Sequence, residues 1–294
     1  TWAGGVSPAT GDNAVIANGH TVTLTANTFI TDFTVNTGGT LNDGGFRLTV
    51  SGNLVINGAY NGDGTGRLVL TGNTVTIDGT GTINNANRID MTVGTTKTIL
   101  ATANLTFTGA NQRIDIKTNN SVINNGTVTL DRITGATITS MWTNAANATL
   151  NISSDLLTTG ALTASATGNT INYNGAAQTI EATTYYHLIL SNSGIKTAGG
   201  ALTVNGNFTI SGAATFDAGT SLAHAFLGNW VVNTSAVTPF SYTTASTVNF
   251  NTPGTPAATS LSGTSASAIG FNNVNLNNSS GFSSFLNFNI TGTL

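Results

Sequence analysis

Five arginines recur at nearly even spacing in the first half of the chain, and their side chains can bind anions. They are Arg47, Arg67, Arg88, Arg113 and Arg132, and the longest interval falls between Arg88 and Arg113. A guanidinium donates hydrogen bonds from a planar fork that matches a carboxylate or another oxyanion. If the fold gathers these arginines, they form a face for an acidic glycan or another surface polyanion. The alternative is a solvated face that Asp90, Asp115 and Asp131 neutralise locally.

Two pairs of aspartates offer a second kind of chemistry. Asp12 and Asp32 are separated by the same interval as Asp43 and Asp63, and this interval matches the arginine spacing. Stacked carboxylates can serve in acid–base catalysis of polysaccharide cleavage or in Ca²⁺ binding. The alternative is that these aspartates only shape turns, since NDGG and NGDG are sequences typical of turns.

Histidine and tryptophan add no recognisable site. The three histidines, His20, His187 and His224, are too dispersed for a ligand set or a triad. The three tryptophans, Trp2, Trp142 and Trp230, can stack on sugars, although filling the interior or covering an end is the simpler role. We therefore predict no catalytic, cofactor-binding or metal-binding residue and a protein that is not an enzyme. A polysaccharide lyase or hydrolase is the less favoured alternative.

The segments around the arginines predict how they are positioned. Each arginine precedes Leu or Ile, and alternation along a strand places that residue on the opposite face. Short strands that return about every 20 residues indicate a β-solenoid, in which each coil buries its apolar side chains only when the next coil stacks on it. Twelve-residue phrases also recur, as in LTVSGNLVINGA (48–59) and LTVNGNFTISGA (202–213).

Composition agrees with an all-β chain. Its 294 residues include 56 Thr, 38 Asn and 35 Gly, which favour strands and turns, and only 19 charged side chains. We expect a right-handed parallel β-helix with about 20 residues per coil. A β-sandwich is the alternative, because Asn57-Gly58 and Asn205-Gly206 are hairpin turn signals. A sandwich does not explain the arginine spacing.

A stretch in the second half carries a resemblance. Residues 183–221, TTYYHLILSNSGIKTAGGALTVNGNFTISGAATFDAGTS, resemble repeats of large exported surface proteins of Bacteroidota, and residues 271–281 resemble the start of another unit. The resemblance implies a right-handed parallel β-helix on a secreted adhesin or fibre. It supplies no catalytic residues.

Charge divides the chain unevenly. Residues 1–132 carry 15 of the 19 charged side chains, and none follows Asp217. We expect regular coils with a charged face over 1–140, continuing over 141–294 as less regular, almost uncharged coils of one continuous rod. The net charge of −3, without a basic tail, argues against nucleic acid, and no apolar run is long enough for a membrane span.

These observations predict an extracellular or cell-surface structural protein. It would be a rod-like stalk or a subunit of an adhesin or filament, assembled by coil stacking and end-to-end contacts, with self-association as its main partnership. No cofactor is expected. The alternative function is a carbohydrate-binding adhesin segment that holds a surface polysaccharide on its arginine face.

Overall fold

The protein is an all-β solenoid whose strands pair in parallel and whose turns are about 21 residues apart. The computed structural model describes residues 8–92, 94, 96–109, 112–242, 245–251, 259–264, 269–277, 281–284 and 288–294. Within these residues there is no helix. The chain forms two compact units, Thr1–Thr149 with Leu157–Leu162, and Leu150–Leu156 with Thr163–Leu294.

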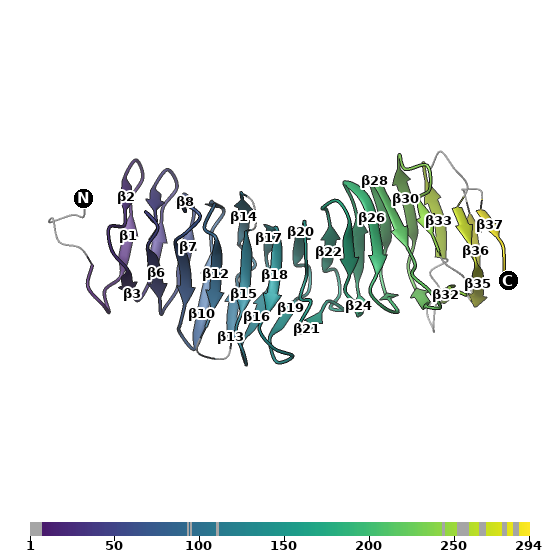
Figure 1. The fold of residues 1–294 in the computed structure, drawn as a ribbon, viewed down its shortest axis with the longest axis horizontal. Coiled ribbons are helices and arrows are strands. Elements are labelled where there is room, and N and C mark those ends of the chain that lie inside the picture. Colours follow the sequence, from purple (N-terminus) through teal and green to yellow (C-terminus); the bar gives the residue numbers. More distant parts are fainter. Residues whose placement is uncertain are drawn as a thin grey trace. The chain divides into compact units, whose positions relative to one another are not determined.

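The first unit has three sheets, one strand of each belonging to every turn. Figure 1 shows these strands stacked side by side, from β1 to β19. The β1 sheet contains β1 (Ala14–Ile16), β4 (Phe33–Val35), β7 (Leu54–Ile56), β10 (Thr74–Asp78), β13 (Thr96–Ile99), β16 (Ser121–Asn124) and β19 (Met141–Asn144). The β2 sheet contains β2 (Thr21–Thr23), β5 (Thr40–Asn42), β8 (Ala59–Asn61), β11 (Thr82–Asn84), β14 (Asn104–Thr108) and β17 (Thr127–Leu130).

The third sheet of this unit carries the arginines. The β3 sheet contains β3 (Thr28–Ile30), β6 (Arg47–Val50), β9 (Arg67–Leu70), β12 (Arg88–Met91), β15 (Arg113–Ile116) and β18 (Arg132–Gly135). Two further strands, β20 (Thr149–Ile152) and β21 (Ala161–Thr163), lie where the chain passes between the units.

The second unit repeats the pattern with strands of uneven length, from two residues in β24 to ten in β28. One sheet contains β22 (Thr170–Tyr173), β25 (His187–Leu190), β28 (Phe208–Asp217), β30 (Trp230–Thr234), β33 (Thr259–Gly263) and β36 (Phe282–Ser284). Another contains β24 (Thr184–Tyr185), β27 (Thr203–Val204), β29 (Ala223–Phe226), β32 (Thr247–Asn251) and β35 (Asn273–Asn277). The remaining strands are β23 (Gln178–Ile180), β26 (Ser193–Ala198), β31 (Phe240–Ser241), β34 (Ile269–Phe271) and β37 (Phe288–Ile290).

Alternation along each strand builds the interior. In the first unit it is mainly aliphatic, as in the turn of β7 to β9, where Leu54, Ile56 and Leu68 are fully buried. In the second unit it becomes aromatic, and Phe208, Phe226 and Trp230 pack with ring centroids 4.6 to 4.9 Å apart. No described strand pair is antiparallel, so the sandwich alternative is wrong. Right-handedness and the single continuous rod stay predictions.

Rows of stacked asparagine side chains also join neighbouring turns through hydrogen bonds. On the β2 sheet, Asn61 donates to Asn42 at 3.3 Å and Asn84 donates to Asn61 at 2.8 Å. The same kind of hydrogen bond occurs between two buried asparagines, where Asn124 donates to Asn144 Oδ1 at 2.8 Å. Each amide satisfies part of its neighbour's hydrogen-bonding capacity, which fixes the register between turns.

Candidate anion-binding face

The five arginines form one column on the β3 sheet, as their spacing predicted. Arg47 pairs in register with Arg67, and Arg113 pairs with both Arg88 and Arg132. Ile89 pairs with Leu68, so Arg88 follows Arg67 in the same column. The longer interval between Arg88 and Arg113 adds chain elsewhere in that turn and leaves the column unbroken.

The arginine side chains cover a second row of residues on the same face. That row includes Asp90 and Asp115, which are only 3% and 8% exposed. Both were expected to lie in solvent beside the arginines. They occupy the expected face, but the side chains of Arg88 and Arg113, which are 27% and 28% exposed, extend over them. The long apolar stems thereby bury two carboxylates while keeping their own charged ends at the surface.

A compact ion-pair network holds these two carboxylates. Arg88 Nε lies 3.1 Å from Asp90, and Arg113 Nε lies 2.9 Å from Asp115. Lys117 bridges both, with its Nζ 3.0 Å from Asp90 and 3.3 Å from Asp115. The sequence interpretation missed Lys117, although alternation from Asp115 places it on this face. Arg67 completes the set through Nη1, 3.4 Å from Asp90.

The network offsets the repulsion between two stacked carboxylates. Asp90 and Asp115 are register partners on adjacent strands, where like charges repel. Burial alone would raise the pKa of Asp115, but a hydrogen bond from Thr134 and the charges of Lys117 and Arg113 outweigh it and lower that pKa.

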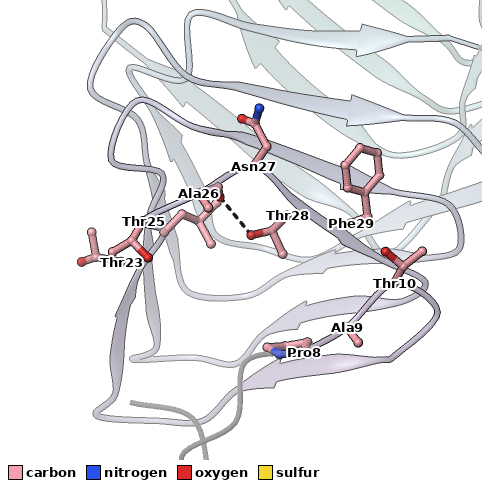
Figure 2. Close-up of a pocket in the computed structure, with 10 residues that line it drawn as sticks. Pro8, Ala9, Thr10, Thr23, Thr25, Ala26, Asn27, Thr28 and Phe29 are labelled. Atoms are coloured by element: carbon pink, nitrogen blue, oxygen red, sulfur yellow. Dashed lines mark hydrogen bonds between the residues drawn. The ribbon is translucent and has the colours of Figure 1, made fainter.

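The column ends beside an exposed aromatic ring. Arg47 places its guanidinium 5.2 Å from the ring centroid of Phe29, which is 43% exposed. Phe29 also lines a hollow of about 330 Å³ between residues 8–10 and 23–29, shown in Figure 2. The wall of this hollow is made of threonine, asparagine and apolar side chains, and Thr28 Oγ1 donates to the carbonyl of Ala26 at 3.1 Å.

Comparison of the chain with protein-family models, with curated proteins and with solved structures found no match. The Bacteroidota resemblance and the adhesin role remain hypotheses.

The paired aspartates act in turns. Asp32 Oδ1 accepts the backbone N–H of Asn53 at 2.6 Å, and Asp12 Oδ2 accepts that of Ala9 at 2.8 Å. Asp43 is fully buried, and its Oδ1 accepts the N–H of Asp63 at 3.2 Å in the next turn. Among the described residues there is no group of three or more His, Asp or Glu side chains placed to hold a metal ion.

Two of the histidines, His187 and His224, and two of the tryptophans serve the fold, whereas His20 is exposed. His187 Nδ1 accepts the N–H of Asn207 at 2.9 Å, and His224 Nδ1 accepts that of Leu202 at 3.2 Å. Burial lowers the pKa of both histidines. Trp142 and Trp230 are fully buried, which agrees with an interior role and leaves no ring for sugar stacking. Trp2 lies outside the described residues.

Two buried lysines, Lys97 and Lys196, were not foreseen. Lys196, within the stretch 183–221 that carries the resemblance, is fully buried. Its Nζ donates to the carbonyl of Gly175 at 2.6 Å, to Gln178 Oε1 at 3.0 Å and to the carbonyl of Ser193 at 3.1 Å, and it also contacts the carbonyl of Ala176. The ammonium therefore supplies hydrogen bonds to the buried oxygen atoms at a corner of the preceding turn. Alternation alone gave no signal for it, because a lysine in a strand normally points outward.

A pair of buried tyrosines forms hydrogen bonds with the backbone at a second corner. Tyr185 Oη donates to the carbonyl of Glu181 at 2.6 Å, and the N–H of Glu181 donates to Tyr173 Oη at 3.0 Å. The two hydroxyls lie 3.0 Å apart, so Tyr173 donates to Tyr185. Burial raises the pKa of both hydroxyls, which keeps them protonated as donors.

No described helix is long and apolar enough to cross a membrane.

Proposed function

We propose that this chain is a non-enzymatic, extracellular structural protein, a solenoid segment of a surface stalk or a subunit of a filament. The observation that supports it is the use of reactive side chains. Asp32, Asp43, His187 and Lys196 each bond the backbone of an adjacent turn. These residue types often act in catalysis, but here their side chains form hydrogen bonds that hold adjacent turns together. Such bonds suit a protein whose role is structural.

End-to-end assembly would use the outermost described strands. Ala14 donates to the carbonyl of Asp32 at 2.9 Å, and Ile16 accepts from Asn36 at 2.9 Å, so both bond toward β4. Alternate residues of a parallel strand bond to opposite neighbours, so the backbone groups of Val15 face away from β4. Because β1 is the outermost described strand of its sheet, this edge can pair with a strand of another copy.

The test uses two matched variants. Val15 and Val55 both point outward on the β1 sheet, aligned through Thr34, but Val15 lies on the outermost strand and Val55 on an inner one. We expect the wild type to form oligomers as its concentration rises in sedimentation velocity, and negative-stain images to show filaments. Val15→Lys should weaken assembly and Val55→Lys should not. A wild type that stays monomeric at high concentration would contradict assembly through this edge.

A further inference from the structure

The partly exposed cations of this chain all gather on one face. Its eight lysines and arginines comprise the five-arginine column, Lys117 on the same face, and two fully buried lysines, Lys97 and Lys196. Three carboxylates, those of Asp90, Asp115 and Asp131, make ion pairs with these partly exposed cations. A protein of net charge −3 therefore presents one face with an excess of positive charge.

Ion pairing within the face does not cancel that excess. Four cations, Arg67, Arg88, Arg113 and Lys117, share the two carboxylates of Asp90 and Asp115. Arg132 pairs with Asp131 at 3.5 Å, and Arg47 has no ion pair with any described residue. The column can thus accept further negative charge without displacing the carboxylates that it already holds.

The way the central arginines are held leaves their recognition ends available. Arg88 and Arg113 contact Asp90 and Asp115 through Nε, and neither uses Nη1 or Nη2 to bond a described residue. The carboxylates therefore fix the middle of each side chain, while the terminal fork, which makes paired hydrogen bonds to oxyanions, points beyond them. A fork already held in position loses little conformational entropy when it binds.

The column also has a defined repeat. Neighbouring strands lie about 4.8 Å apart, so successive arginines form a straight row with one fork per turn. An extended polyuronate carries a carboxylate on each sugar ring and so offers negative charge at a comparable repeat. Proteins that bind single-stranded nucleic acids stack the bases on aromatic rings along a basic groove. Among the described residues, the one cation–π contact of the column is that of Arg47 with Phe29, at one end.

We propose that the face formed by Arg47, Arg67, Arg88, Arg113, Lys117 and Arg132 binds a linear, carboxylate-bearing polysaccharide laid across the strands, with Arg88 and Arg113 making the central paired hydrogen bonds. This ligand-binding role goes beyond the structural function proposed above. Either can fail without the other, because assembly was assigned to the edge strand β1 and polysaccharide binding to the outer surface of the β3 sheet.

The experiment measures binding of fluorescently labelled polygalacturonate by anisotropy at low ionic strength. The wild type should bind the polymer and not monomeric galacturonate or neutral dextran. Arg88→Gln with Arg113→Gln should weaken binding by at least about tenfold, since two charge-assisted forks are lost. Arg88→Lys with Arg113→Lys should also weaken it, because the charge remains but the fork does not.

The controls separate recognition from net charge and from misfolding. Asn36→Asp with Asn147→Asp makes the same change in net charge at exposed turns and should weaken binding far less. Arg47→Gln removes a cation without touching the carboxylate network, and should weaken binding in a protein whose melting temperature is unchanged.

Three results would overturn the proposal. The first is an absence of polygalacturonate binding by the wild type at low salt. The second is unchanged binding by both the double glutamine variant and Arg47→Gln. The third is tighter binding of an oligothymidylate that carries the same number of charges, which would assign the face to single-stranded nucleic acid instead.

Discussion

Replacing Trp230 by two different residues tests how the interior of the second unit is stabilised. Trp230 is fully buried, with its ring centroid 4.6 Å from that of Phe226, 4.8 Å from Phe208 and 5.5 Å from Phe271. Its indole Nε1–H is buried without a hydrogen-bond acceptor among the described residues. The side chain therefore contributes a large apolar surface and one unfavourable polar group.

Apolar burial and the unsatisfied N–H have opposite effects on the free energy of unfolding, so Trp230→Ala and Trp230→Phe should change it by different amounts. A buried tryptophan removes about 200 Å² from water, worth about 5 kcal/mol at roughly 25 cal/mol per Å². Trp230→Ala should therefore lower the free energy of unfolding by about 4 to 5 kcal/mol. Trp230→Phe keeps one aromatic ring and removes the unsatisfied N–H, whose burial costs about 1 to 3 kcal/mol, so its net effect should stay within about 1 kcal/mol.

Urea unfolding followed by far-UV circular dichroism measures both values. Trp142→Phe in the first unit is the companion variant, because Trp142 is also fully buried with its Nε1–H unsatisfied. The reasoning would be refuted if Trp230→Phe cost as much as Trp230→Ala. It would also be refuted if Trp230→Ala lowered the free energy of unfolding by less than about 2 kcal/mol, since the cavity left in a fully packed aromatic site costs more than that.

Two further predictions concern charge. Burial lowers the pKa of Lys97 and Lys196 from 10.5 to about 8, so between these values the unfolded chain binds more protons than the folded one. The free energy of unfolding should therefore rise as pH increases from 8 to 9.5, by up to about 1.4 kcal/mol per pH unit for each lysine; urea titrations that show a flat or falling profile would contradict it. Separately, Asp90→Asn removes the carboxylate shared by Arg67, Arg88 and Lys117 and should destabilise the protein by about 2 kcal/mol, more at low salt, because breaking a buried ion pair leaves unpaired charge. Asp131→Asn, in a more exposed pair, should cost less than about 1 kcal/mol by the same thermal or urea assay, and equal losses for the two variants would argue against a special role for Asp90.

The repeat was readable from sequence because stacking places equivalent residues next to each other. Arg88 and Arg113 could be aligned despite the extra residues between them, since RID occurs in both and only one register superimposes it. Leu68 and Ile89 followed for the same reason, because alternation fixes which face of a strand a residue occupies. These features depend on local pattern alone.

Burial of polar groups was not readable in this way. Asp90 was assigned correctly to the outer face, but its burial depends on how neighbouring arginines fold over it, which a strand pattern does not contain. Lys97 lies inward between Val75 and Val122, its register partners, where sequence alternation predicts only an apolar residue. Asp43 was ambiguous between catalysis and a turn until its acceptance of the Asp63 N–H was seen.

The longer interval between Arg88 and Arg113 shows how such a chain can change in length. The additional residues were accommodated while Arg, Ile and Asp kept their partners across β12 and β15. Each turn touches mainly its immediate neighbours, so whole turns can be gained or lost by recombination without redesigning the remainder. The number of stacked turns and the number of arginines in the column would then change together, one turn at a time.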